Sequence, residues 1–274
     1  MKTELRTTFF ATAVLLSFMA CSGISHSFAA EAERKAGDRM TLEIKGVEYA
    51  FRWCPPGTFM MGAPVGEEGL VGRDGPRGQH QVTLTRGFWM LETLVTQEMW
   101  ISVMGNNPSG FKGAKLPVEF VNWNMCQEYL RKLNELGVAP AGYKFSLPTE
   151  AQWEYACRAG TTTPFYFGNV LHRDQANFEA HRTTEVRFYP PNSWGLYDMH
   201  GNVMEWCYDW YGPYPKGEVT DPTGPPTGET RVCRGGRWRH AARFCRSAAR
   251  DHDEPGSRSS SSQGFRVVLV PDSR

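Results

Sequence analysis

The sequence predicts an α+β fold with few helices, short twisted strands and much loop. Apolar and polar residues alternate from Met40 to Gly62, which is a strand pattern. Three later segments carry apolar residues at a spacing of three to four, which is a helix pattern. With 274 residues, 41% of them hydrophobic, the chain can bury one large core, so we expect one domain after processing.

The strand pattern lies in "MTLEIKGVEYAFRWCPPGTFMMG", residues 40–62, and turns at Pro55, Pro56 and Gly57. The next stretch, "EEGLVGRDGPRGQHQVTL", predicts a Gly-rich loop that leads into another strand. It lacks the Lys-Ser/Thr ending of a phosphate-binding loop, so we assign it no nucleotide site.

The first two helices are predicted in "TQEMWISVMG" and "NWNMCQEYLRKLNEL", where Thr96 and Asn122 are suitable N-caps. The third is "LPTEAQWEYACRAG", with Pro148 at its start, Thr149 as cap and Gly160 at its end. Downstream of it, Gly and Pro separate short aromatic strands, and "DPTGPPTGETR" predicts a loop.

Glu150 and Glu154 lie one turn apart in the third helix, as a metal-binding pair would. Capping by Glu150, or salt bridges, is the simpler use of these two carboxylates.

The N-terminus predicts export. Lys2 and Arg6 precede the apolar run "FFATAVLLSFMAC", so residues 1–20 resemble a signal peptide, too short to span a membrane. Cys21 would then be lipidated, residues 21–39 would be a tether, and the protein would be anchored in the outer or cell membrane. Cleavage near Ser27-Phe28-Ala29, after a longer signal of about 30 residues, is the alternative and gives a periplasmic or secreted protein.

Charge and cysteine content exclude some classes of protein. The net charge is +1, which argues against a nucleic-acid binder because such proteins carry a sustained basic excess. Besides Cys21 there are six cysteines without a CxxC pair, which disfavours a zinc ribbon. They are expected as buried thiols or as one or two disulfides. The six are Cys54, Cys126, Cys157, Cys207, Cys233 and Cys245.

Five long motifs resemble a known family. They are "GTFMMG", "PVEFVNWNMCQEYL", "FSLPTEAQWEYACRAG", "NSWGLYDMHGNVMEWCYDWY" and "RVCRGGRW…CRSAAR…GFRVVL". In this order they are similar to the formylglycine-generating enzyme, or sulfatase-modifying factor, family, over about residues 45–270. The resemblance implies a variant of the C-type lectin fold in a domain at residues 40–274.

The resemblance also indicates which positions would bind the catalytic copper. Oxidases of the family bind copper with two thiolates, which are soft ligands suited to Cu(I). Here the first Cys position after Gly236 is His240, and the second is Cys245. One thiolate is therefore missing, so we expect no copper and no enzymatic activity. A copper-dependent formylglycine-generating oxidase, or a related sulfatase-modifying enzyme, is the alternative function.

The resemblance implies a calcium site in "GLYDMHGNVMEW". Asp198 and Glu205 would bind Ca²⁺ through their carboxylates, and Gly201 and Val203 through their carbonyl oxygens. In the alternative interpretation, the two carboxylates accept from backbone amides or arginines. His200, beside Asp198, is expected as a partly exposed loop residue, since no nucleophile pattern accompanies it.

The last motif encloses residues 237–262, which resemble the variable region of retroelement-diversified proteins, a non-enzymatic branch of the family. In that branch, mutation of the adenines in AAC codons yields types such as Arg, His, Ala, Phe, Asp and Ser, but never Lys, Glu, Gln, Met or Trp. Trp238, Glu254 and Gln263 are therefore assigned to a fixed frame. The candidate variable residues are Arg237, Arg239, His240, Ala241, Arg243, Phe244, Ala249, Asp251, His252, Asp253, Ser257, Ser259, Ser260, Ser261 and Ser262.

These residues predict a ligand-binding surface on a rigid scaffold. The expected partner is a macromolecule, either a protein or a cell-surface component. The nine Arg and three acidic residues between 231 and 266 favour an anionic ligand. The alternative without ligand binding is a passive polar loop on a structural protein of the cell envelope.

Overall fold

The alternating pattern near the start of the domain forms a β-hairpin at the edge of a larger sheet. The computed structural model describes residues 34–64, 66–67, 78–257 and 262–272, and a compact unit begins at Lys35. The predicted export signal and Cys21 lie outside these residues. Strand β1 (Arg39–Ile44) pairs antiparallel with β2 (Val47–Cys54), so that Met40 lies opposite Phe51.

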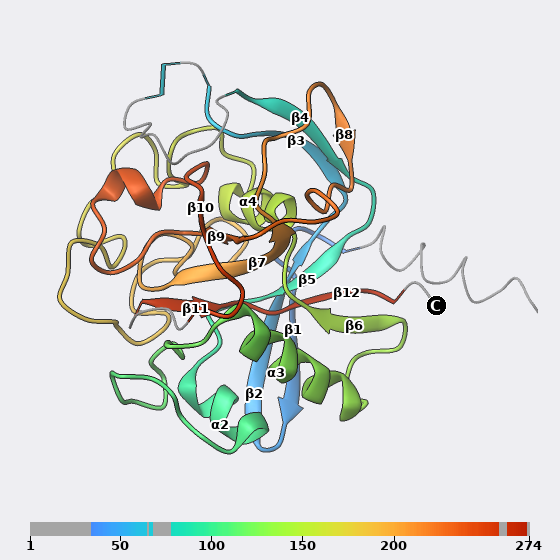
Figure 1. Cartoon of the computed structure of the whole chain (residues 1–274), viewed down its shortest axis with the longest axis vertical. Coiled ribbons are helices and arrows are strands. Elements are labelled where there is room, and N and C mark those ends of the chain that lie inside the picture. The colour runs from blue at the N-terminus through green and yellow to red at the C-terminus, as the bar shows by residue number, and fades with distance from the viewer. Residues whose placement is uncertain (1–33, 65, 68–77, 258–261, 273–274) are drawn as a thin grey trace, which may run out of the picture. The chain divides into compact units, whose positions relative to one another are not determined.

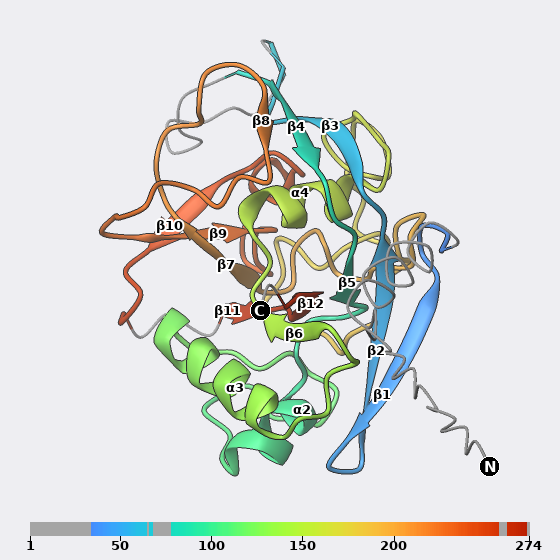
Figure 2. The same cartoon turned by 90° about the vertical axis from the view of Figure 1, so that its right-hand side faces the viewer.

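The strands of the described residues form three sheets (Figures 1 and 2). The largest has the order β1-β2-β5-β12-β6, with β5 at Phe88–Leu91, β12 at Val268–Pro271 and β6 at Tyr143–Ser146. The second has the order β10-β9-β7-β11, at Asp251–Asp253, Arg231–Arg234, Met204–Trp210 and Gln263–Phe265. The third has the order β3-β4-β8, at Gly57–Met61, His80–Leu84 and Val219–Thr220.

Strand β5, in the middle of the five-stranded sheet, is buried on both faces, which explains why its residues do not alternate. Trp89 and Leu91 pack into one hydrophobic cluster, and Phe88 and Met90 into another. A strand covered on both sides is apolar at every position. Helices α2 (Gln97–Met104) and α3 (Trp123–Glu135) lie on the opposite side of β12 from α4 (Glu150–Arg158), as both views show.

All three predicted N-caps are confirmed. The side chains of Thr96, Asn122 and Thr149 accept from backbone N–H groups in the first turns of their helices. Gln152, rather than Glu150, completes the capping box of α4. Of the two uses predicted for Glu150, the structure has the salt bridge, with Arg250.

The strands within residues 231–272 connect the four-stranded sheet with the five-stranded sheet. These residues supply β9 and β10, then β11, which pairs in parallel with β7, and finally β12, which lies between β5 and β6. The candidate variable residues are therefore enclosed on both sides by strands of the core. No helix within the described residues has the length and apolar character needed to cross a membrane.

Candidate ligand-binding face

The candidate variable residues that the structure describes form the candidate ligand-binding face. Two segments of the chain pack closely where this face begins. Gly235 and Gly236 follow β9 with φ of +90° and +73°, in the left-handed region that glycine adopts without strain. A Cβ atom on Gly236 would lie 2.5 Å from Sγ of Cys245, so only glycine fits there. The "GG" of the motif thus lets two segments of the face pack directly on each other.

Four buried arginines of the frame fix the face to the rest of the fold. Each forms an ion pair with a buried carboxylate: Arg234 with Glu154, Arg246 with Glu67, Arg250 with Glu150 and Arg266 with Glu205. The Arg250 pair is bidentate, with N···O distances of 2.6 and 2.7 Å. Such pairs fix geometry because a charge left alone in the interior is costly.

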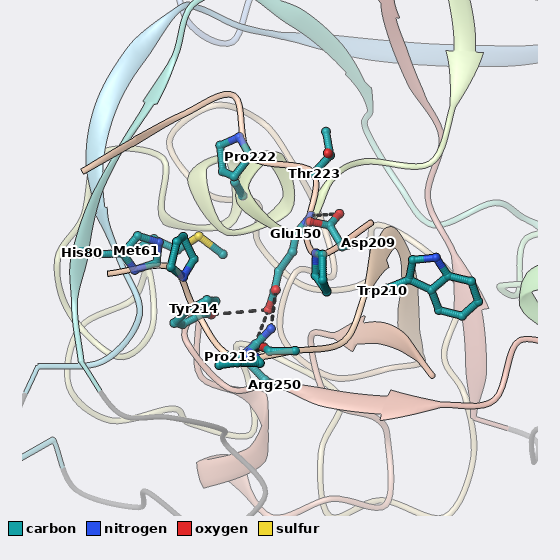
Figure 3. Close-up of a pocket in the computed structure, with 15 residues that line it drawn as sticks. Met61, His80, Glu150, Asp209, Trp210, Pro213, Tyr214, Pro222, Thr223 and Arg250 are labelled. Atoms are coloured by element: carbon teal, nitrogen blue, oxygen red, sulfur yellow. Dashed lines mark hydrogen bonds and ion pairs between the residues drawn. The ribbon is translucent and has the colours of Figure 1, made fainter. Parts of the chain in front are cut away.

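The Glu150–Arg250 pair lines a pocket of about 300 Å³ (Figure 3). Its other walls are mainly apolar and include Met61, Trp210 and Tyr214. Tyr214 reaches toward Glu150, with a distance of 3.4 Å between the hydroxyl oxygen and Oε1. Arg250 lies in the sequence between the candidate variable residues Ala249 and Asp251, so it connects this pocket to the face.

Asp209 lies in the same pocket and accepts from the backbone N–H of Glu150 at 2.8 Å. Burial, and next the charge of Glu150, raise the pKa of Asp209 to about 8. The protonated carboxyl therefore predominates at neutral pH, which avoids placing two carboxylates side by side.

The structure separates the candidate variable residues by burial. Arg239 and Arg243 are exposed, whereas Ala249 and Ser262 are buried, so the expectation that all fifteen lie on the surface is wrong for these two. Ser259, Ser260 and Ser261 lie outside the described residues. The remaining eight are partly exposed: Arg237, His240, Ala241, Phe244, Asp251, His252, Asp253 and Ser257.

Arg237 contacts two other candidate variable residues, His240 and Asp251. Its Nε donates to Nε2 of His240 at 2.7 Å, and its Nη2 lies 3.6 Å from a carboxylate oxygen of Asp251. Burial, and then the charges of Arg237 and Arg239, lower the pKa of His240 to about 3. His240 is therefore a neutral imidazole whose Nε2 accepts from a guanidinium.

The copper alternative finds no suitable donor set in this geometry. Cys245 is fully buried in a small cluster with Phe165 and Leu171, and burial raises its pKa to about 12. It is a thiol at neutral pH, while Nε2 of His240 is bonded to Arg237. The residues do not fit a thiolate copper site. All six cysteines beyond Cys21 are buried and free, which is the first of the two expected arrangements.

His200 is a structural residue rather than a partly exposed one, which corrects the expectation. It is 1% exposed, its Nδ1 lies 2.7 Å from the carbonyl oxygen of Cys245, and its Nε2 accepts from the backbone N–H of Tyr166. Burial lowers the pKa of His200 to about 3. The neutral ring links the loop at 166 to the base of the face.

The predicted calcium ligands already have partners. Both carboxylate oxygens of Glu205 accept from Arg266 at 3.0 Å, and Asp198 accepts from the N–H of Arg187 at 3.1 Å. This is the arrangement given by the alternative interpretation. A calcium ion bound by Glu205 would have to displace Arg266, so this pairing does not fit the ion as it stands. Gly201 lies in the same loop, where its N–H donates to the carbonyl of Gly235.

Two segments that the sequence did not place at the face contact it. The ring of Phe111, in the loop between α2 and α3, meets Trp238 edge-on with centroids 6.0 Å apart. The backbone of Glu179 donates to the carbonyl of His240, and that of Ala180 to the carbonyl of Trp238. These contacts are long-range, and no local pattern in the sequence signals them.

Few helices, short strands in three sheets and a loop-rich face built from the C-terminal strands define a C-type lectin fold of the formylglycine-generating-enzyme type. Residues 47–270 match the family described as sulfatase-modifying factor enzyme 1-like domain, and the chain belongs to this family.

Similar proteins include both enzymes and a variable protein. The chain is 36% identical over 203 residues to the formylglycine-generating enzyme of Streptomyces coelicolor, which covers 63% of this chain and 61% of that protein. It is 40% identical over 161 residues to the serine/threonine-protein kinase pkn1 of Chlamydia pneumoniae, which covers 57% of this chain but 24% of the kinase. The chain thus spans a quarter to three fifths of the length of these relatives.

Among solved structures, Treponema denticola variable protein 1 is similar with a TM-score of 0.74 and 29% identity. The match covers 85% of this chain and 99% of that protein, so the two share the fold over nearly their whole described length.

Proposed function

We propose that this protein is a non-catalytic ligand-binding protein whose residues 237–262 are diversified by a retroelement. It is exported and anchored by a lipid on Cys21, and it binds a protein or another cell-surface component. Variation of the exposed residues alters which ligand is bound, while the frame keeps their positions.

The observation that supports this proposal is the division between frame and variable residues. Frame residues such as Arg246, Gln263 and Phe265 are buried, although Trp238 is half-buried and Glu254 is exposed, whereas ten of the twelve described candidates have exposed surface. A stretch that alternates in this way tolerates changes of side chain without loss of the fold. The similarity to Treponema denticola variable protein 1 supports the same interpretation.

The DNA around the end of the gene tests the proposal directly. We expect an Asn-rich near-copy of the segment for residues 231–269 beside a reverse transcriptase, with mismatches confined to adenines. Sibling isolates should differ at the same positions. Absence of the copy, or mismatches spread over all bases, removes the diversification and leaves a passive loop of the envelope.

Absence of catalysis is tested separately. The purified protein should retain no stoichiometric copper and should not oxidise a sulfatase-motif thiol with oxygen. Tight copper binding that is lost in both His240→Ala and Cys245→Ala variants would restore the oxidase alternative.

Calcium binding stays a prediction with its own measurement. If Asp198 and Glu205 bind the ion, the melting temperature rises with added calcium relative to EGTA, because a ligand at 100-fold its Kd adds about 2.7 kcal/mol to folding. Magnesium is the matched control. Equal melting temperatures in calcium and EGTA would leave Glu205 as the partner of Arg266 alone.

A further inference from the structure

The loop between α2 and α3 borders the face at both ends. At one end Phe111 meets Trp238, as described above. At the other, Nδ2 of Asn122 donates to the carbonyl of Gly256 at 3.1 Å. Figure 1 shows this green loop passing beneath β11. The loop therefore follows the diversified stretch without belonging to it.

Phe120 in this loop is both exposed and conformationally strained. Its φ is +60°, in the left-handed region, where a bulky side chain costs about 1–3 kcal/mol. The side chain nevertheless keeps 37% of its surface in solvent. A Cβ atom on Gly110 would lie 2.9 Å from its ring, so the ring rests directly on the backbone of Gly110. Strain of this kind persists only where the surroundings impose it.

Glu119, the residue before Phe120, is held by two hydrogen bonds. Its buried carboxylate accepts from the N–H of Phe111 at 2.8 Å, and its own N–H donates to Oγ of Ser109 at 3.1 Å. The second carboxylate oxygen has no hydrogen-bond partner among the described residues. The buried side chain of Glu119 thus fixes the backbone at Phe111, and its own N–H holds the residue before Phe120 in place.

Positive charge lies beside the ring of Phe111 in this loop and beside the ring of Phe244 in the face. The guanidinium of Arg182 lies 5.5 Å from the centre of the Phe111 ring, and that of Arg243 lies 4.7 Å from the Phe244 ring. Both arginines are exposed, and neither has a carboxylate partner within the described part of the chain. Aromatic and arginine side chains together are typical of the strongest contacts in protein interfaces.

We infer that Phe111, Phe120 and Arg182 form a constant anchor beside the diversified residues. The anchor binds an acidic segment of a protein ligand that presents an apolar side chain. Charge complementarity comes from Arg182, and the two rings supply apolar area at low entropic cost. A polyanion without apolar groups would make no apolar contact with the strained, exposed Phe120. This inference rests on the proposed binding function, because it adds a fixed part to the same face.

A synthetic probe tests the anchor on the full chain. The probe is a short fluorescein-labelled acidic peptide with Phe and Leu at its centre, and binding is read by fluorescence anisotropy. We expect the peptide to bind, and a version with Lys in place of every Asp and Glu not to bind. Phe120→Gly should weaken binding about tenfold, as loss of one aromatic contact does.

Phe120→Gly separates binding from folding. Glycine relieves the strain at φ +60°, so the melting temperature should stay the same or rise while binding falls. The matched control is Leu136→Ala, an exposed apolar residue at the far end of α3, about 20 Å along the helix from Asn122. It should bind the peptide as the parent protein does.

Several outcomes would overturn the anchor: no binding of the acidic peptide, equal binding of the Lys peptide, or unchanged binding by Phe120→Gly. Full competition by heparin together with unchanged binding by Phe120→Gly would indicate a surface for polyanions instead. The double variant Arg243→Ser, Phe244→Ser distinguishes the two proposals. If it alters binding and Phe120→Gly does not, only the anchor fails. If it has no effect and Phe120→Gly does, the diversified face is not the binding site.

Discussion

Candidate variable residues that are close in the sequence differ sharply in what they contact. Arg243 is exposed, with its guanidinium over the ring of Phe244. Ala249, six positions later, is 5% exposed, and its carbonyl accepts from the buried Arg234. Both are residue types that adenine mutation of AAC codons yields, so residue type alone does not tell which position can vary freely.

Arg243→Ser should therefore affect stability much less than Ala249→Asp. Arg243→Ser should change the free energy of unfolding by no more than about 0.5 kcal/mol, as surface substitutions do. Ala249→Asp places a carboxylate in the interior and should cost at least about 1–3 kcal/mol. Urea denaturation of both variants measures this. Equal midpoints would mean that position 249 is open to solvent and belongs to the binding face.

The buried ion pairs make a second prediction at this scale. Arg266→Met leaves Glu205 without its partner in the interior, so the free energy of unfolding should fall by roughly 3–5 kcal/mol. Arg131→Ala is the matched control, because its pairs with Glu128 and Glu135 are exposed, and its urea midpoint should stay close to that of the parent. A loss in the control as large as in Arg266→Met would contradict this explanation.

Local sequence patterns identified candidate residues, but they did not predict the burial and the partners of all of them. The salt bridge predicted for Glu150 is confirmed, with Arg250, whereas His200 was expected to be partly exposed but is buried against the carbonyl of Cys245. Burial and ion pairing depend on segments that are distant in the sequence, and local patterns carry no information about them.

At the scale of elements, the helices and the first strands followed from the sequence. Caps and apolar spacing are local, so the ends of α2, α3 and α4 were predicted close to where they lie. Strand β5 and the course of the loop between α2 and α3 were not predicted. The apolar run of β5 has no alternation, since both of its faces are covered. The loop is placed by single contacts such as that of Phe111 with Trp238.

The contact between β7 and α4 should make stability depend on pH. The pKa of Asp209, at the end of β7, is about 8 in the folded chain, above its ordinary value of 3.8. The folded state thus holds a proton that the unfolded state releases. Its stabilising contribution is complete below pH 3.8 and is lost as the pH rises toward 8.

Asp209→Asn should remove this dependence, because the amide carbonyl can still accept from the N–H of Glu150. Relative to the variant, the parent should lose up to about 1.4 kcal/mol for each pH unit between roughly pH 5 and 8. Urea midpoints of both proteins across this range measure the difference. Parallel pH profiles would show that Asp209 is ionised in the folded protein throughout.

For the whole molecule, the six free cysteines give a direct measure of folding and processing. All are buried, and burial raises the pKa of Cys54 and Cys157 among them, so the native protein should not react with a thiol reagent. If Cys21 is lipidated or removed, as we propose, the protein unfolded in guanidinium should show six reactive thiols. Seven would mean that Cys21 is retained without lipid, and fewer than six would mean that disulfides form. The mass of the N-terminal peptide then distinguishes a lipidated Cys21 from cleavage near Ala29.

The position of β12 has a consequence for how variants are selected. This strand follows the candidate variable residues and lies between β5 and β6 in the five-stranded sheet. A frameshift or premature stop anywhere in residues 237–262 would delete it and leave two strands of the core without their neighbour. Such chains would lack a buried strand of the five-stranded sheet and would not fold stably. If the segment is diversified as we propose, only in-frame, full-length variants would therefore yield folded protein.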